Sequence, residues 1–282
     1  MAAPWGIQAR GAGFENRVTD GGEDPDNRWV DVETFLRDGY VVVRGAFGTA
    51  IAAACQDLIW ASLANHGVLR DDRRTWDRPC VRIDCPEGEP FALAATSPAL
   101  TAAYDELIGE GRWIRRAGVG GTVPVRFPSE EYPGDVGYHI EGSWWGGEEY
   151  WTNIRSRGRG LLALFLFSDI GSEDAPTRLV LGSHLFVPPV LASAGDTGMA
   201  GGAVVERLQP SVLCRRTADA TGQAGDVYLC HPFIVHTATW PHRGTAPRMM
   251  AQPGVEVPGF VLDGSDPSPV ARAIVSGLAQ TG

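Results

Sequence analysis

Short apolar and β-branched segments follow one another from residue 121 to residue 257, and turn residues separate nearly all of them. Such segments, with no alternating helices between them and no repeat period, predict an antiparallel rather than a parallel sheet. The 36 Gly and 20 Pro support the same turn-rich reading. We therefore expect a mainly β fold with flanking helices, either a closed barrel or a double sheet, and we favour the jelly roll. The nine expected strands are 121–128, 137–141, 151–155, 160–168, 178–181, 212–214, 226–230, 234–240 and 247–257.

Helices are expected before and after this strand-rich region. Asp31 is a good N-cap, and Gly39 is a good terminator immediately before the β-branched run at 40–43. Ser97 and Pro98 have the residue types of a helix start. The apolar spacing and these signals predict helices from Asp31 to Gly39, at 49–66, at 97–108 and at 268–280.

The first thirty residues differ from the rest in composition. They are rich in Gly, Asp, Glu and Asn, with scattered apolar positions, so we expect an N-terminal arm or lid over residues 1–30. No linker-like break divides the remainder. A chain of 282 residues can bury a large single core. Residues 31–282 are therefore predicted to form one jelly-roll domain with helical additions.

The charge balance excludes several classes of function. The formal net charge is −10, which argues against nucleic acid or an anionic membrane as the main partner and favours a neutral or cationic small-molecule substrate. All 24 basic residues are Arg, because the sequence contains no Lys. Without Lys there is no Schiff-base lysine and no P-loop lysine, and the enzyme classes that need either are excluded.

Features of the sequence also predict where the protein resides. The five Cys are an odd number and form no C-x-x-C pair, so reduced, mostly buried thiols are expected. No basic-then-apolar leader opens the sequence, and no apolar run is long enough to span a bilayer. We expect a cytoplasmic protein.

One constellation of side chains predicts a metal centre. His139 and Glu141 are two residues apart in an expected strand, so both side chains point to the same face. His236, in a later expected strand, is a candidate for the third ligand. Two imidazoles and one carboxylate leave three coordination positions open, which suits an Fe(II) ion that binds a bidentate co-substrate and then O₂. Zinc sites ordinarily keep at most one open position.

The surroundings of these residues resemble the phytanoyl-CoA dioxygenase family of Fe(II)- and 2-oxoglutarate-dependent oxygenases. The resemblance extends over roughly residues 32–257. The motifs that carry it are GDVYLCHP at 225–232, followed by His236 and Arg248, FLRDGYVVVRG at 35–45, and GSH at 182–184.

The resemblance implies a cupin-like double-stranded β-helix, another name for a jelly roll, that binds Fe(II) through His139, Glu141 and His236. The co-substrates would be 2-oxoglutarate and O₂, and the implied reaction is the hydroxylation of an unactivated C–H bond. Members usually carry H-x-D, so Glu141 departs from the pattern. It nevertheless provides a carboxylate ligand, which argues against the halogenating relatives that lack one.

The same resemblance suggests residues for the co-substrate. Arg248 would hold the distal carboxylate of 2-oxoglutarate in a bidentate pair. Many members have a Ser two residues after the distal His, but this chain has Ala238, which leaves Thr237 or Thr239 as candidate hydroxyl donors. Where several members use a Lys on the strand before the first motif, this chain has Arg126, for which a surface position is an equal alternative.

The loop at 142–151 directly follows the first motif and is the best candidate for substrate contacts. Exposed aromatic rings beside carboxylates suit a hydroxylated amine or a sugar-like secondary metabolite, such as those of antibiotic biosynthesis. The alternative is that these tryptophans are core residues. Arg155, Arg157 and Arg159 alternate along an expected strand and could instead hold the phosphates of a CoA ester. The candidate substrate contacts are Trp144, Trp145, Glu148 and Trp151.

Two other functions use the same residues differently. A jelly-roll hydrolase or isomerase would hold zinc or manganese with the three metal ligands and use Glu148 as an acid or base. A carbohydrate-binding jelly roll would use the tryptophans alone. Arg248 separates these readings, because only a 2-oxoglutarate enzyme needs an arginine at that spacing. The sequence leaves open whether hydroxylation or oxidative cyclisation follows, and also the oligomeric state.

Overall fold

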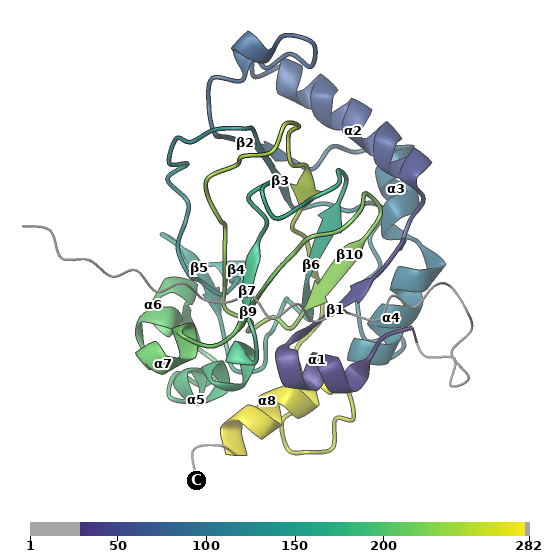
Figure 1. Ribbon diagram of the computed structural model, residues 1–282. Coiled ribbons are helices and arrows are strands. Elements are labelled where there is room, and N and C mark those ends of the chain that lie inside the picture. Colours follow the sequence, from purple (N-terminus) through teal and green to yellow (C-terminus); the bar gives the residue numbers. More distant parts are fainter. Residues whose placement is uncertain (1–28, 280–282) are drawn as a thin grey trace, which may run out of the picture.

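The largest sheet of the computed structural model, which describes residues 29–279, is antiparallel and has five strands. Figure 1 shows β6 and β10 at the centre of the molecule, with β1 beside β10. β6 also pairs with the two short strands near the end of the chain. The strands are β1 (Tyr40–Val43), β10 (Val227–Cys230), β6 (Leu161–Leu166), β12 (Met250–Ala251) and β13 (Gly254–Val255).

β6 explains why this sheet forms a middle layer. All six of its residues are buried, so its apolar sequence is unbroken. Leu161 and Phe165 pack into a core shared with the helices. Leu162 and Leu166 point to the opposite face and join a separate apolar cluster. Both faces of the sheet are therefore covered.

A second antiparallel sheet lies across that separate cluster. In it β7 (Arg178–Val180) pairs with β11 (His236–Thr237) on one side and with β9 (Thr217–Asp219) on the other. Side chains from both sheets meet in what we call the inner cluster. Its buried members are Leu162, Leu164, Leu166, Ile170, Leu179, Ala220, Tyr228, Cys230, Ile234 and Met250. The two sheets thus face each other across a shared apolar interior, as the expected double-sheet fold requires.

Two smaller sheets extend this framework. β2 (Cys80–Asp84) pairs with β3 (Thr122–Arg126) along their full lengths. β4 (Trp144–Trp145) and β5 (Tyr150–Thr152) form a hairpin, and β8 (Met199–Ala200) pairs with the outer side of β5. All these pairings are antiparallel.

The four expected helices are present. Asp31 caps the first by accepting a hydrogen bond from the Thr34 amide, and Gly39 ends it in the left-handed conformation. The Ser97 hydroxyl, by contrast, donates to the Ala46 carbonyl and does not cap its own helix. The four are α1 (Val32–Asp38), α2 (Thr49–Ala64), α4 (Pro98–Ile108) and α8 (Pro269–Ala279). Figure 1 shows α2 and α4 along one side of the central strands and α8 at one end of the molecule.

Several of the expected strands differ in the structure: 247–257 is divided between β12 and β13, and 151–155 is strand only as far as Thr152. The strand at 212–214 is wrong, because Pro210 starts a helical turn there that buries Val212. The segment 137–141 contributes only an isolated bridge at His139, and 234–240 is strand only at His236–Thr237. Several elements were not expected: α3 (Glu89–Ala95), α5 (Val187–Ala192), α6 (Gly201–Glu206), α7 (Pro210–Leu213), two single turns at Arg73–Thr75 and Ser183–Leu185, and the strands β2, β4, β8 and β9.

Some expectations concern the whole chain. Residues 1–28 of the expected arm lie outside the described residues, so the division at residue 30 stays a prediction. All five cysteines are free thiols. Among residues 29–279, no helix has both the length and the apolar character needed to span a bilayer.

Candidate active site

Backbone pairing places the two candidate histidine ligands side by side. His139 and His236 are directly opposite partners in an antiparallel bridge, and each amide donates to the other's carbonyl, at 2.9 and 3.0 Å. Directly opposite residues of such a pair point to the same face. The ring centroids are accordingly 4.3 Å apart. Two hydrogen bonds are therefore enough to fix the relative position of the imidazoles without a regular strand at His139.

Both imidazoles are oriented by a hydrogen bond at Nδ1. The Nδ1 of His139 lies 2.8 Å from the Gly137 carbonyl, and the Nδ1 of His236 lies 3.1 Å from the Ile234 carbonyl. Because a carbonyl oxygen only accepts, each Nδ1 carries the proton and donates it. Each Nε2 is therefore the ring nitrogen left to bind a metal, which is the arrangement that metal-binding histidines use.

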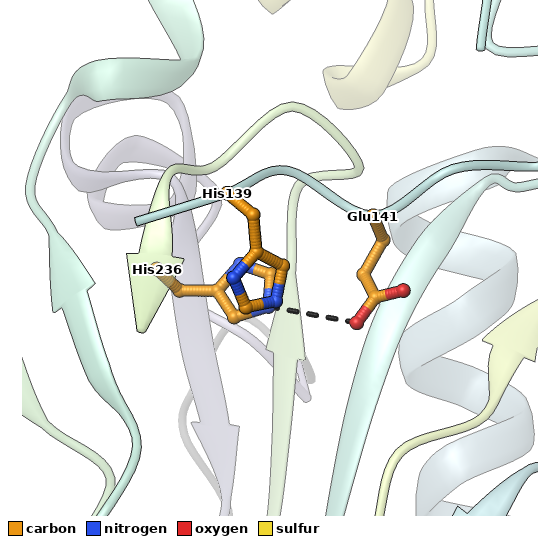
Figure 2. A group of neighbouring side chains, drawn as sticks. All are labelled: His139, Glu141 and His236. Carbon is orange, nitrogen blue, oxygen red and sulfur yellow. Dashed lines mark ion pairs between the residues drawn. The ribbon is translucent and has the colours of Figure 1, made fainter. Parts of the chain in front are cut away.

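Glu141 completes the cluster (Figure 2). One of its carboxylate oxygens lies 3.6 Å from the His236 Nε2, and the ligand atoms of the three residues all lie within 4.8 Å of one another. Burial would raise the pKa of Glu141, but the contact with His236 and the charge of Arg159 lower it to about 2. Burial lowers the pKa of His139, and the neighbouring His236 adds to this effect. At neutral pH Glu141 is thus a carboxylate, and the imidazole of His139 is neutral.

Arg159 belongs to this cluster, although the sequence pattern placed it elsewhere. The residues after β5 form turns, so the expected strand face of alternating arginines at 155–159 is wrong. The Arg159 Nε instead donates to the Gly142 carbonyl at 3.0 Å, and its Nη2 lies 3.8 Å from the Glu141 carboxylate. Arg159 therefore fixes the backbone directly after Glu141 and supplies a positive charge beside it.

Arg248 and Arg126 also lie together. They are opposite partners in an antiparallel bridge, and Arg248 is two residues from Met250 of the inner cluster, so both arginines extend from the inner face. Their exposed fractions are only 1% and 2%. The surface position considered for Arg126 is excluded.

The guanidinium groups of this pair are only partly satisfied. Arg248 donates to the carbonyls of Ala175 at 2.7 Å and Pro124 at 3.4 Å, and Arg126 forms an ion pair with Asp135. The Nε of each arginine is buried and has no hydrogen-bond partner within the described residues. Burial, with a contribution from Arg126, lowers the pKa of Arg248 to about 9. Both groups therefore offer unpaired donors to an anion inside the protein.

The two threonine hydroxyls named as candidates are already engaged. The Thr237 Oγ1 accepts from the Gly137 amide at 3.0 Å and donates to the Ala238 carbonyl at 2.9 Å. The Thr239 hydroxyl donates to the Pro176 carbonyl at 2.6 Å. Thr237 thus holds the segment that leads into His139.

The aromatic loop forms the β4–β5 hairpin and divides into two faces. Trp144 is opposite Trp151, and both are half-buried. Trp145 and Tyr150 form the next cross-strand pair, with ring centroids 5.1 Å apart, and they are 58% and 59% exposed. Glu148 is exposed in the turn between the strands.

The hairpin lies directly beside the metal cluster. Gly142 follows Glu141, and a Cβ atom built on it would lie 2.4 Å from the Cβ of Tyr150. Glycine is therefore required there for the hairpin to pack this closely. Of the four candidate substrate residues, Trp145 and Glu148 are open to solvent, whereas Trp144 and Trp151 are the pair that the packing partly covers.

The histidines of the two flanking motifs have structural contacts. His184 Nε2 donates to the Leu36 carbonyl at 3.2 Å, and His231 Nδ1 accepts from the Phe233 amide at 3.1 Å. Both side chains are fully buried, and their rings lie 4.9 Å apart. They join α1 to the turn at Ser183–Leu185 and to the end of β10.

Comparisons with known proteins identify solved structures that have a similar fold. No family model matches the chain, and no curated protein matches it. Among solved structures, the non-heme alpha ketoglutarate dependent carbocyclase SnoK from nogalamycin biosynthesis is 16% identical, with 83% of this chain and 87% of that chain covered and a TM-score of 0.59.

A second solved structure is the epimerase SnoN in complex with Fe³⁺, alpha ketoglutarate and nogalamycin RO. It is 21% identical, with 80% of this chain and 81% of that chain covered and a TM-score of 0.57. A putative oxidoreductase from Salmonella typhimurium LT2 is 15% identical, with 81% of this chain and 70% of that chain covered and a TM-score of 0.52. The chain therefore has a fold in common with iron- and 2-oxoglutarate-dependent enzymes, and the His-Glu-His cluster is present within it.

Proposed function

We propose that this chain is an Fe(II)- and 2-oxoglutarate-dependent oxygenase that oxidises an unactivated C–H bond of a small, polar secondary metabolite. The observation that carries the proposal is the cluster of His139, Glu141 and His236, whose ligand atoms lie within 4.8 Å of one another. A fold that is used by enzymes of this class supports it.

The donor set suits iron. Two imidazole Nε2 atoms and one carboxylate on one face leave open positions for a chelating co-substrate and O₂. The Nδ1 hydrogen bonds keep both rings oriented before any metal binds, and Arg159 fixes the backbone after Glu141. When bound, iron with 2-oxoglutarate and O₂ supplies the C–H oxidation, and the protein supplies the placement of the substrate.

The buried arginines suit 2-oxoglutarate. Its distal carboxylate requires donors inside the protein, and the unpaired Nε atoms of Arg248 and Arg126 are such donors. Arg126 is balanced by Asp135, whereas no carboxylate of residues 29–279 forms an ion pair with Arg248. We therefore propose that Arg248 is the main partner of the distal carboxylate and that Arg126 is the second. Thr237 is assigned a different role, which is to hold the neighbouring backbone through its hydroxyl.

The proposal also covers the type of fold, the domain division, the family and the cellular location. Two antiparallel sheets that face each other across the inner cluster support a double-stranded β-helix formed by a single domain, residues 31–282. The motifs at 35–45, 182–184 and 225–232 support a place near the phytanoyl-CoA dioxygenases. The proposal includes a cytoplasmic location.

For the substrate we propose a hydroxylated amine or sugar-like metabolite that contacts the exposed face of the β4–β5 hairpin. Trp145 and Tyr150 offer aromatic surface beside Glu148, a combination that binds C–H faces and cations. The SnoN structure contains bound nogalamycin RO, which supports a secondary metabolite. Hydroxylation is the default outcome. Because the related structures are an epimerase and a carbocyclase, oxidative cyclisation is the second outcome to test.

The competing function is a metal-dependent hydrolase or isomerase that uses the same three ligands. Such an enzyme would not need the buried, unpaired Arg248 between the sheets, whereas a 2-oxoglutarate enzyme needs it to bind the distal carboxylate. A carbohydrate-binding protein would need neither the metal cluster nor Arg248.

The decisive experiment is an anaerobic titration of the metal-free protein with Fe(II) and then with 2-oxoglutarate, monitored by the weak visible absorption of the chelate. We expect the band in the wild type, a band only at much higher 2-oxoglutarate concentration in Arg248→Met, and no Fe(II) binding after His236→Ala. Arg243→Met is the matched arginine control, because Arg243 is exposed and pairs with Glu130. Iron binding without the band would overturn the co-substrate assignment and favour the hydrolase. Succinate release with a panel of amino sugars then tests the substrate class.

A further inference from the structure

Thr177 has a buried hydroxyl that the proposed residues do not account for. The residue is 2% exposed, and its Oγ1 has no hydrogen-bond partner within residues 29–279. Its backbone carbonyl is satisfied, because it accepts from the Ala220 amide at 2.8 Å. Proteins rarely leave a buried hydroxyl unpaired, since burial removes the water that would otherwise bind it. An unpaired hydroxyl in the interior therefore points to a missing partner.

The strand register places this side chain on the face of the metal cluster. β7 pairs with β11 so that Leu179 is opposite His236 and Arg178 is opposite Thr237. The hydrogen bond from the Thr239 hydroxyl to the Pro176 carbonyl shows that the same register continues beyond the strand ends. Thr177 is two residues before Leu179, a member of the inner cluster, so it points to the same face as Leu179 and His236.

The next step along this segment leads to Arg248. The Arg248 Nη1 donates to the carbonyl of Ala175, two residues before Thr177. Thr177 therefore lies between the strand position opposite His236 and the position that holds the guanidinium. From Leu179, which is opposite His236, to Thr177 the extended chain spans about 6.6 Å, which is close to the separation of the two ends of a five-carbon diacid.

We propose that the Thr177 hydroxyl donates a hydrogen bond to the distal carboxylate of bound 2-oxoglutarate, together with Arg248. This inference rests on the proposed function. A carboxylate accepts from both donors at once, and it would satisfy the Thr177 hydroxyl and the Arg248 Nε that the protein alone leaves unpaired. Residue 238 is opposite Thr177 in the continued register and is an alanine, so no other hydroxyl competes at this position of the face.

The pairing of β7 with β11 indicates which variants test this inference. The variants are Thr177→Val, which replaces the hydroxyl by a methyl group, Thr239→Val as the matched threonine control, and the double variant Thr177→Val with Ala238→Ser. Each Fe(II)-loaded protein is titrated anaerobically with 2-oxoglutarate and, separately, with oxalate. Oxalate chelates a metal but has no distal carboxylate, so it reports on the metal centre alone.

We expect Thr177→Val to weaken 2-oxoglutarate binding about 10- to 100-fold, the range for one lost hydrogen bond to a charged group. Binding of Fe(II) and of oxalate should stay within about 2-fold of the wild type, as should 2-oxoglutarate binding to Thr239→Val. Ala238→Ser should restore most of the lost affinity, because it places a hydroxyl on the same face from the opposite strand.

Three results would overturn the inference. These are unchanged 2-oxoglutarate affinity in Thr177→Val, an equal loss for oxalate, and an equal loss in Thr239→Val, which would place the effect in the strand pairing. Failure of the wild type to bind 2-oxoglutarate at all would instead refute the proposed function, so the two failures are distinguishable.

Discussion

Replacing Arg248 with methionine should separate binding from folding. In the protein alone this guanidinium is a buried cation with two carbonyl partners and an unpaired Nε. Methionine has a similar length and no charge. We predict that Arg248→Met loses 2-oxoglutarate binding while the free energy of unfolding of the ligand-free protein stays near the wild-type value or rises.

The stability estimate combines two opposing effects. The carbonyls of Ala175 and Pro124 lose their donors, at a cost of about 1 kcal/mol for each hydrogen bond. Removing a buried charge returns about 1–4 kcal/mol when an apolar side chain fills the space. The lowered pKa of Arg248, about 9, shows that burial already disfavours its charged form. For a chain of this size, the melting temperature should therefore change by no more than about 6 °C.

The expected loss of 2-oxoglutarate binding energy is larger than the change in stability, and both lost hydrogen bonds weaken binding. A bidentate pair contributes two charge-assisted hydrogen bonds of about 1.5–3 kcal/mol each, so the dissociation constant should rise roughly 10²- to 10⁴-fold. The assay is thermal unfolding of metal-loaded protein with increasing 2-oxoglutarate. At about 100 times the dissociation constant, the ligand stabilises the wild type by about 2.7 kcal/mol. The same concentrations should stabilise Arg248→Met by no more than about 0.4 kcal/mol, so its melting temperature should change little.

The control is Arg243→Met, which removes an exposed arginine and should keep the full response to 2-oxoglutarate. The reasoning is refuted if Arg248→Met still shows the wild-type ligand response. It is also refuted if the ligand-free variant loses much more stability than two hydrogen bonds account for, because Arg248 would then be a structural residue.

Three other predictions concern the surroundings of the site. Arg159→Met should weaken Fe(II) binding about 10- to 100-fold by calorimetric titration, because it frees the backbone beside the carboxylate ligand; unchanged affinity would contradict this. Burial raises the pKa of Asp266, but Arg112 outweighs it and lowers that pKa to about 2, so this carboxylate stabilises the fold above about pH 4 and the effect disappears as the pH falls toward 2. Asp266→Asn should accordingly cost about 2 kcal/mol in urea unfolding at pH 6 and much less near pH 2; equal losses at both would refute the assignment. Gly142→Ala should push Tyr150 away and increase hydrogen exchange across the β4–β5 hairpin, since the added Cβ would lie 2.4 Å from that of Tyr150; unaltered exchange would show that the hairpin packs differently.

The metal cluster could be predicted from the sequence because its geometry depends on short-range rules. A spacing of two residues puts His139 and Glu141 on one face wherever the chain is extended, and the structure keeps this relation although no regular strand forms there. The Asp31 cap and the Gly39 terminator are equally local. His236 requires more, since only the motif around it indicates that two distant segments pair.

The contacts that sequence reasoning missed depend on long-range pairing. The alternation of Arg159 with Arg155 predicts a strand face, but turns after β5 direct Arg159 to Gly142 instead. Thr177 carries no recognisable motif, and only the register of β7 against β11 shows that it shares a face with His236. The apolar residues at 212–214 favour a strand, whereas Pro210 already signals the helix start that the structure has.

Electrostatics shows most clearly why a property of the whole chain does not determine a site. The net charge of −10 favours neutral or cationic partners for the surface, yet the proposed co-substrate is a dianion. Most acidic side chains are exposed, and salt screens exposed charges beyond about 8 Å. Inside the protein, Arg126 and Arg248 face the same interior, only Arg126 of the two forms an ion pair with a carboxylate of residues 29–279, and neither guanidinium is in water. A few buried charges therefore set the local potential, and a dianion supplies the negative charge that these two arginines lack.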